Sequence, residues 1–297
     1  MKKPGHRYFH LDVFGESKYS GNQLAVVLPE SRITPAGMQA IAREFNFPET
    51  TFIQSNTAKR GAWPVRIFTP FREVPFAGHP TLGTAYAIRE FLARGKPAEI
   101  VLDLKIGRIP VGFQDGSEGV IWMRQNAPAF GSVHSRAAVA GMLGLTAKDV
   151  DPRFPAQEVS TGFNWLLVPL KNLDAVKRAR MDLAACEAHF RKPPEAVPPI
   201  FLFSPETYTR ESRINSRSFA PQFGVPEDPA TGSANGNLAG WLSRHRYFGS
   251  DSVDISVEQG WEMGRKSRLH LRAESGSKGI TVEVGGRVFE VAEGRLR

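Results

Sequence analysis

The stretch EDPATGSANGN, residues 227–237, places two acidic residues and a proline directly before a run of very small side chains. Such a run suits a turn that ends a strand and opens a helix. Gly232 would let the backbone approach a ligand, and the N–H groups that follow could bind an anion. The alternative is an ordinary helix start, because Asp228, Thr231 and Ser233 are all competent caps. Taken alone, the stretch leaves both interpretations open.

A similar pattern occurs earlier in the chain. Both FAGHPTLGTAYAI, residues 76–88, and DPATGSANGNLAGW, residues 228–241, place a glycine, a proline and small residues at the start of an apolar helix. This echo predicts two similar halves, 1–128 and 129–297, divided in the polar, proline-containing region 125–135. If the halves face each other, two helix N-termini meet at one cleft, where their positive ends suit a carboxylate.

The periodicity of the chain predicts an α+β protein. Period-two or continuously apolar segments dominate, such as TTFIQ (50–54), VRIFTP (65–70) and PIFLFSP (199–205). Many follow one another without a helix between them, which favours antiparallel or mixed sheets. Thr34 and Pro35 open one helix, and Pro80 opens another that Gly95 closes. Gly285 and Gly286 separate the last two strands and predict a hairpin.

Composition limits the possible partners. A chain of 297 residues has room for about two domains. No apolar run approaches the ~20 residues of a membrane helix, and MKKPGHRYFH lacks the apolar stretch of a signal peptide, so we expect a cytoplasmic protein without a membrane partner. The formal charge of +8 comes from scattered basic residues without a nucleic-acid motif. We therefore expect no nucleic-acid partner; a solvated surface is favoured over attraction of an anionic metabolite.

Several kinds of chemistry are excluded. Cys186 is the only cysteine, so one chain can form neither a disulfide nor a pair of catalytic thiols. It lies in DLAACEAHF (182–190), where an Asp182 cap and an apolar helix face predict core packing. The histidines lack zinc-type spacing, so we expect no metal. Serine-hydrolase, phosphate-loop and dinucleotide motifs are absent, which leaves acid/base chemistry on a small substrate.

Two residues could carry such chemistry. Glu49 lies among phenylalanines and a proline in FNFPETTFI (45–53), where a carboxylate loses hydration and could both accept and return a proton. It could equally lie in a solvated turn. His79 stands just before Pro80 and could hydrogen-bond a substrate or help to move a proton, or it could merely cap the helix.

Five segments together resemble the phenazine-biosynthesis PhzF-like isomerases of the diaminopimelate-epimerase-like fold: FHLDVFGESKYSGNQLAVVLPE, FNFPETTFI, VRIFTPFREVPFAGHPTLGTA, PEDPATGSANGNLAGWL and EQGWEMGRKSRLHLR. The resemblance spans nearly the whole chain in order. It implies two similar domains, each a barrel-like, mostly antiparallel or mixed sheet around a central helix, with the active site between them, and a homodimer. It also implies a cofactor-free isomerase, since a characterised member of the family moves a proton along the ring of trans-2,3-dihydro-3-hydroxyanthranilate.

The resemblance also implies roles for individual residues. Glu49 falls on the acid/base, with His79 and Asp228 as further catalytic residues. The residues that hold the substrate carboxylate by backbone amides are Gly78, Gly232 and Ser233. Thiol-using epimerases of the wider fold carry a cysteine in each half, and this chain has His79 and Ser233 in those regions instead. Lys266 stands where a proline is frequent, a departure that concerns only a loop.

The expected function is therefore a cofactor-independent isomerase. It would move a proton between carbons of a small cyclic or unsaturated amino or hydroxy acid, a small carboxylated metabolite. Two alternatives remain open. One is a non-catalytic module that binds such a metabolite or a protein partner, and the other is an epimerase that uses two carboxyl-type bases.

Overall fold

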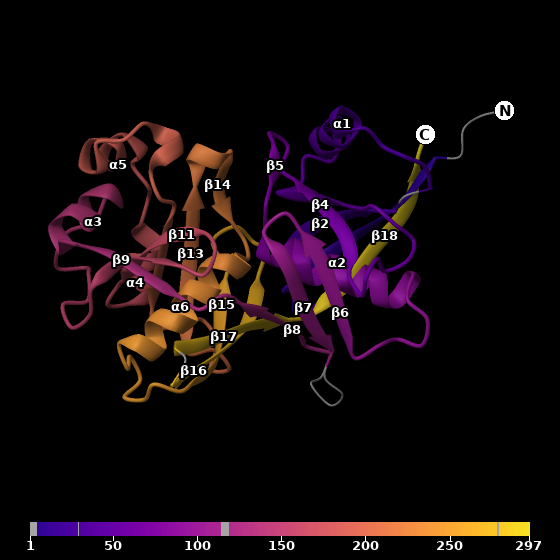
Figure 1. Ribbon diagram of the computed structural model, residues 1–297. Helices are drawn as coiled ribbons and strands as arrows, with labels where there is room; N and C mark the ends of the chain where they lie inside the picture. The colour runs from indigo at the N-terminus through magenta and orange to yellow at the C-terminus, as the bar shows by residue number, and fades with distance from the viewer. Residues whose placement is uncertain (1–4, 29, 114–118, 278) are drawn as a thin grey trace. The chain divides into compact units, whose positions relative to one another are not determined.

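The computed structural model describes residues 5–28, 30–113, 119–277 and 279–297, and the chain divides into two compact units (Figure 1). Unit 1 comprises residues 1–124 and 285–297, and unit 2 comprises residues 125–284. The first boundary between the units, after Arg124, lies four residues before the predicted boundary after residue 128. The C-terminal segment, however, belongs to unit 1, because β18 (Val288–Leu296) pairs antiparallel with β1 (His6–Val13). No helix in the described ranges is long and apolar enough to cross a membrane.

The hairpin predicted at Gly285 and Gly286 is wrong. These glycines end β17 (Gly279–Gly286), and β18 follows at once but takes β1 as its partner. Turn residues report only local geometry, whereas the partner of a strand is chosen by packing at long range.

Unit 1 is a mixed sheet with two helices. Its strands pair in the order β18, β1, β2, β3, β4, β6, β7, β8; β2 with β3 and β4 with β6 are parallel, and the other pairs are antiparallel. The short β5 pairs with β4. The elements not yet given are β2 (Asn22–Val27), α1 (Pro35–Phe45), β3 (Glu49–Ile53), β4 (Trp63–Phe68), β5 (Glu73–Val74), α2 (Gly78–Phe91), β6 (Glu99–Leu104), β7 (Gly107–Phe113) and β8 (Ile121–Gln125).

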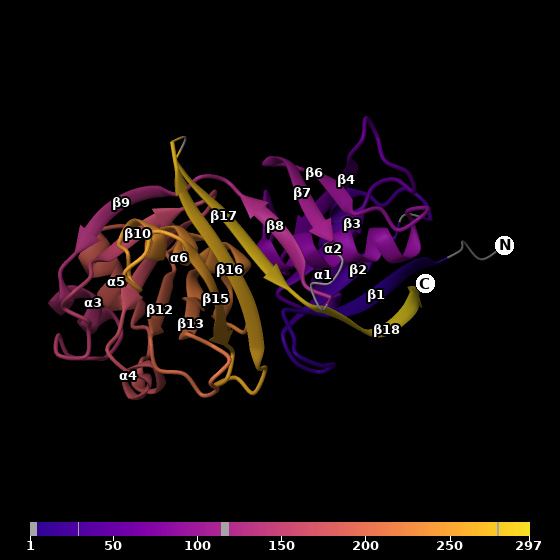
Figure 2. The same ribbon diagram turned by 90° about the horizontal axis from the view of Figure 1, so that it is seen from below.

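Helix α2 forms the centre of unit 1. It contacts β1, β2, β3, β6, β7 and β18, so strands surround it (Figures 1 and 2). The packing is close: a Cβ on Gly83 would lie 2.5 Å from the Leu24 side chain. Thr51 of β3 accepts a 2.8 Å hydrogen bond from Thr84 of α2, whereas its neighbour Phe52 packs on the α1 side. Alternate residues of β3 therefore face α2 and α1.

Both helices begin near their predicted starts. In α1 the Thr34 side chain accepts the Gly37 N–H, and Pro35 is the first residue. Helix α2 begins at Gly78, two residues before the predicted start at Pro80. The proline is tolerated because N–H groups of the first helical turn have no partner within the helix.

Unit 2 is a second mixed sheet. Its strands pair in the order β9, β10, β11, β12, β13, β15, β16, with β11 parallel to β12 and β13 parallel to β15, and β14 pairs with β13. Its elements, besides β17, are β9 (Ala129–His134), α3 (Arg136–Met142), β10 (Ala156–Ser160), β11 (Asn164–Pro169), α4 (Leu173–Arg178), α5 (Leu183–Phe190), η1 (Pro194–Ala196), β12 (Ile200–Ser204), β13 (Ile214–Ala220), η2 (Pro221–Phe223), β14 (Val225–Asp228), α6 (Gly232–Arg244), β15 (Val253–Gln259) and β16 (Ser267–Gly276).

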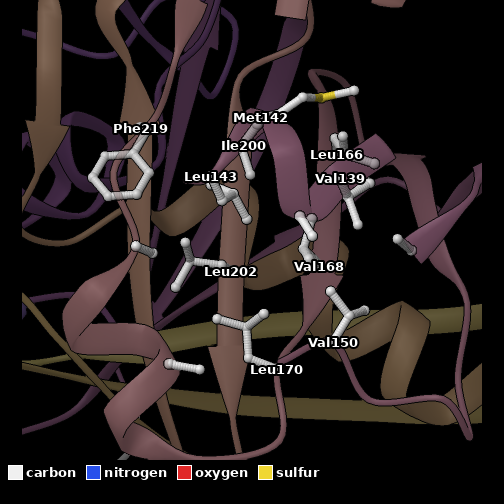
Figure 3. Packing of buried hydrophobic residues seen from close by; sticks show 14 of the residues in the cluster. Val139, Met142, Leu143, Val150, Leu166, Val168, Leu170, Ile200, Leu202 and Phe219 are labelled. Carbon is white, nitrogen blue, oxygen red and sulfur yellow. The ribbon is translucent and has the colours of Figure 1, made fainter. Parts of the chain in front are cut away.

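The sheet of unit 2 has a core on each face. Helix α6 contacts β10, β11, β15 and β16 on one face. On the other face, Ile200 and Leu202 of β12 join a cluster with residues of α3, α4 and α5 (Figure 3). Cys186 belongs to this cluster, as predicted, and burial raises the pKa of its thiol to about 12. The thiol is therefore protonated and serves packing.

The two sheets have one order of pairing. In unit 1 the strands β1, β2, β3, β4, β6 and β7 pair as antiparallel, parallel, antiparallel, parallel, antiparallel. In unit 2 the strands β10, β11, β12, β13, β15 and β16 follow the same sequence. A short strand and the central helix are inserted at the same place in each, β5 with α2 and β14 with α6. The sequence echo therefore corresponds to an internal repeat of structure.

Candidate active site

Glu49 and His79 come together within unit 1. Glu49 is the first residue of β3, beside Leu24 in the parallel register, and shares the face of Thr51 toward α2. His79 is the second residue of α2. The His79 Nε2 atom lies 3.4 Å from Glu49 Oε2, and the side chains are only 4% and 17% exposed. The same Nε2 lies 3.3 Å from the Gln23 carbonyl oxygen. The solvated-turn alternative for Glu49 therefore does not describe its position.

His79 is neutral near pH 7. Burial lowers the pKa of its imidazole to about 3, against a smaller opposing effect of the Gln23 carbonyl. Its contact with Glu49 is thus a polar contact and not an ion pair. Both neighbours of Nε2 are acceptors, so the tautomer with its proton on Nε2 is the one that can donate to them. The His79 imidazole does not cap α2. The N-cap residue of α2 is Ala77, and within the described residues no side chain makes a cap hydrogen bond there.

Asp228, Gly232 and Ser233 lie together within unit 2. Asp228 ends β14, and its Oδ2 accepts a 2.5 Å hydrogen bond from the Thr231 hydroxyl. Gly232 is the buried first residue of α6. Ser233 follows, and its hydroxyl oxygen accepts a 3.2 Å hydrogen bond from the Trp165 indole.

The central helices differ from the others at their N-termini. Side chains of Thr34, Ser135, Asn172 and Asp182 cap α1, α3, α4 and α5. Within the described residues, no side chain makes such a cap bond at α2 or α6. Thr231 is the N-cap residue of α6, but its side chain bonds elsewhere: the hydroxyl donates to Asp228, and its oxygen accepts from the Gln259 amide. Both ends therefore keep the N–H groups and partial positive charge that favour an anion.

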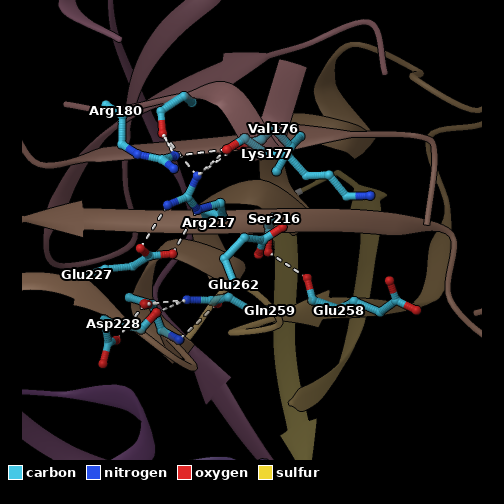
Figure 4. A network of polar contacts seen from close by, with 12 residues as sticks. Val176, Lys177, Arg180, Ser216, Arg217, Glu227, Asp228, Glu258, Gln259 and Glu262 are labelled. Atoms are coloured by element: carbon cyan, nitrogen blue, oxygen red, sulfur yellow. Dashed lines mark hydrogen bonds and ion pairs between the residues drawn. The ribbon is translucent and has the colours of Figure 1, made fainter. Parts of the chain in front are cut away.

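An arginine–glutamate pair holds the segment before each central helix. In unit 1, Arg66 donates to both carboxylate oxygens of Glu73 at 2.8 Å. In unit 2, Arg217 does the same to Glu227 at 2.8 and 2.9 Å (Figure 4). Glu73 and Glu227 each stand five residues before the glycine that opens the helix, at Gly78 and Gly232. This equal spacing is the sequence signal that could have revealed the pairs.

The pairs also align the two units residue by residue. In the sheet, Arg66 lies opposite Phe52, and Arg217 lies opposite Leu202. Three residues before Phe52 is Glu49, and three residues before Leu202 is Pro199, so Glu49 and Pro199 are equivalent positions. Counting from the helix glycines, His79 corresponds to Ser233. The positions that hold a carboxyl and an imidazole in unit 1 thus hold a proline and a hydroxyl in unit 2.

The loop that contains Lys266 begins against Pro229, since a Cβ on Gly260 would lie 2.7 Å from the Pro229 carbonyl oxygen. The Lys266 ammonium lies over the Trp261 ring at 4.2 Å, Trp261 stacks on Tyr208 at 4.4 Å, and Lys177 covers Tyr208 at 4.8 Å. Lys266 therefore contributes a cation–π contact that a proline could not make.

In the described part of the chain, no three His, Cys, Asp or Glu side chains gather as ligands for a metal ion.

Known proteins match the chain over nearly its full length. The sequence model of the phenazine biosynthesis-like proteins, PhzC-PhzF, matches residues 11–294. An uncharacterized isomerase of Mesorhizobium japonicum is 35% identical over 97% of this chain and 98% of its own. The trans-2,3-dihydro-3-hydroxyanthranilate isomerase of Pseudomonas aeruginosa is 34% identical over 98% and 99%. The crystal structure of a phenazine biosynthesis protein of the PhzF family from Bacillus anthracis covers 100% of both chains with a TM-score of 0.89 and 29% identity.

Proposed function

The chain belongs to the phenazine biosynthesis-like protein family, and on this premise we propose that it is a cofactor-independent isomerase of the PhzF-like type. The substrate would be a small cyclic or unsaturated amino or hydroxy acid, similar to the trans-2,3-dihydro-3-hydroxyanthranilate named for the Pseudomonas aeruginosa relative. Both units would be variants of the diaminopimelate-epimerase-like domain. The observation that carries the proposal is the contact between the shielded Glu49 carboxyl and the neutral His79.

Glu49 would act as the single acid/base. Its carboxylate takes the proton of an activated C–H bond, and the electron pair of that bond becomes part of a shifted double bond. The protonated Glu49 then gives the same proton to another carbon, so no redox partner is needed. His79, with its proton on Nε2, would keep the Glu49 carboxylate oriented by donating toward it.

The residues of unit 2 would recognise the polar groups of the substrate. Gly232 and Ser233 stand at an N-terminus that no side chain in the described residues caps, which supports a role for their amides in holding a carboxylate. Gly78 has the same place at α2. Asp228 would accept a hydrogen bond from an amino or hydroxyl group of the substrate.

The two alternatives make different predictions. An epimerase with two bases would need a second carboxyl, for which Asp228 is the candidate, and would invert a stereocentre of its substrate. The repeat favours one base, because the counterparts of Glu49 and His79 are Pro199 and Ser233. A module that only binds its ligand would leave the C–H bonds of that ligand untouched, whereas an isomerase exchanges or moves the proton.

Glu49→Gln provides the test. In deuterium oxide with trans-2,3-dihydro-3-hydroxyanthranilate, and then with a panel of cyclic amino and hydroxy acids, we expect turnover and label exchange to fall by about 10²- to 10⁴-fold while ligand binding stays measurable. Glu158→Gln is the matched control, because Glu158 also contacts a histidine, His134 at 3.0 Å, and is 18% exposed. Turnover of Glu49→Gln above a tenth of wild type would contradict the assignment.

The proposal also includes the oligomeric state that the family resemblance implies. We expect a cytoplasmic homodimer, for which light scattering should give twice the mass of one chain.

A further inference from the structure

Gln259 uses its whole side chain to hold the segment that contains Asp228. It ends β15 and is fully buried. Its Oε1 accepts the Thr231 backbone N–H and the Asn235 amide, both at 3.0 Å. Its Nε2 donates to the Asp228 carbonyl at 2.8 Å and to the Thr231 hydroxyl oxygen at 2.9 Å (Figure 4). Two donors and two acceptor positions are thus satisfied within residues 228–235.

The direction of these hydrogen bonds is fixed by their partners. A backbone N–H can donate only to the oxygen of the Gln259 amide, and a carbonyl can accept only from its nitrogen, so the amide has one orientation. The Thr231 oxygen accepts from that nitrogen, which leaves the single hydroxyl proton to point elsewhere. It donates to Asp228 Oδ2 at 2.5 Å. The chain therefore runs from the Gln259 amide through the Thr231 hydroxyl to the Asp228 carboxylate.

We propose that Gln259 and Thr231 are positioning residues for Asp228 in the proposed isomerase reaction, on which this inference rests. Gln259 sets the direction of the Thr231 hydroxyl, and the hydroxyl holds one oxygen of Asp228 as an acceptor. The same amide binds the Asp228 backbone, so both ends of the aspartate are fixed. Neither residue needs to touch the substrate.

Three variants test the chain in turnover of trans-2,3-dihydro-3-hydroxyanthranilate. Thr231→Val keeps the shape but removes the hydroxyl, and we expect kcat/KM to fall about 10- to 100-fold, the range of a hydrogen bond to a charged group. Thr231→Ser keeps the hydroxyl and should stay within about threefold of wild type. Gln259→Met should act like Thr231→Val. The double variant Gln259→Met/Thr231→Val should be no worse than the poorer single variant, and additive losses would overturn the chain.

A matched control separates positioning from simple destabilisation. Gln157 is also a largely buried amide of unit 2, bonded to the Gly131 carbonyl and to His245. Gln157→Met should lower stability without changing kcat/KM. An equal loss of kcat/KM in Gln157→Met and Gln259→Met would refute the positioning role.

A second measurement is independent of any substrate. In crystal structures of the variants, the Asp228 carboxylate should leave its wild-type rotamer in Thr231→Val and keep it in Thr231→Ser. An unchanged Asp228 in Thr231→Val overturns the inference even if no turnover is found. Conversely, if Glu49→Gln retains turnover, the proposed function fails, whereas an inactive Glu49→Gln beside a fully active Thr231→Val refutes only the positioning chain.

Discussion

The two arginine–glutamate pairs offer an internal comparison of burial. Arg217 is 4% exposed and Glu227 18%, whereas Arg66 and Glu73 are 28% and 26% exposed. Both pairs are bidentate with nearly equal distances. We predict that Arg217→Met destabilises the protein far more than Arg66→Met, although each substitution removes the same guanidinium from the same place in the repeat.

The expected magnitudes follow from what each substitution leaves behind. Removing Arg217 strands the shielded Glu227 carboxylate and also the Val176 carbonyl, which accepts from the same guanidinium at 2.9 Å. The Ala179 carbonyl loses its 3.0 Å hydrogen bond from Arg217 but keeps one of 2.7 Å from Arg180. Breaking a buried pair in this way costs about 3–5 kcal/mol. Water can solvate Glu73 once Arg66 is gone, so that loss should be about 1 kcal/mol or less.

Urea unfolding, monitored by hydrogen exchange in peptides from each unit, measures the loss of stability in both variants. We expect the loss in unit 2 for Arg217→Met to exceed the loss in unit 1 for Arg66→Met by about 2–4 kcal/mol. The controls are the double variants Arg66→Met/Glu73→Gln and Arg217→Met/Glu227→Gln. Neutralising the unpaired carboxylate should recover part of the stability lost in Arg217→Met and little of that lost in Arg66→Met. Equal losses in the two units would refute the argument from burial.

Three further predictions concern titrating side chains. Burial lowers the pKa of His79 from 6.5 to about 3, so between these pH values only the unfolded chain takes up this proton. The free energy of unfolding should therefore decrease as the pH falls from about 6.5 toward 3. In urea unfolding, His79→Gln should show a weaker dependence of this free energy on pH. Hydrogen bonds from Arg178 and then from Thr146 lower the pKa of Asp149 from 3.8 to about 2, which adds stability above pH 3.8 that is lost as the pH falls through about 2. Arg178→Met should reduce this acid-range slope and leave the part that Thr146 contributes. Cys186 is fully buried with a pKa raised to about 12, so a thiol reagent should modify it only as fast as the protein unfolds, and rapid modification of the folded chain would contradict this.

Local signals in the sequence were sufficient for the helix starts. Thr34 and Asp182 cap their helices as predicted, because capping depends on residues within one turn. Strand partners were not predictable in the same way. The pairing of β18 with β1 joins the two ends of the chain, and nothing in the local period of either strand names the other.

The candidate site shows the same limit. Motifs singled out Glu49 and His79, but their contact depends on β3 lying beside the first turn of α2, and the neutral state of the imidazole depends on burial. Gln259 gave no signal, since a buried amide is recognised only by partners that the register supplies. The pair of Arg217 with Glu227 could be approached only through the equal spacing of Glu73 and Glu227 from their helix glycines. The residues proposed to react carry recognisable chemistry, whereas those that hold them are identified only from their contacts.

The internal repeat distinguishes the residues proposed to react from the residues that hold them, which sequence motifs alone could not do. Arg66 and Glu73 have the same residue types at the equivalent positions of unit 2, and so does the glycine that opens the central helix. Glu49 and His79 do not, since Pro199 and Ser233 replace them. One scaffold therefore presents a carboxyl in unit 1, the proposed proton acceptor, and in unit 2 a hydroxyl at a helix start that no side chain in the described residues caps. The change from one to the other involves the first residue of a strand and the second of a helix, so the proposed division into proton transfer and anion binding requires no difference in fold.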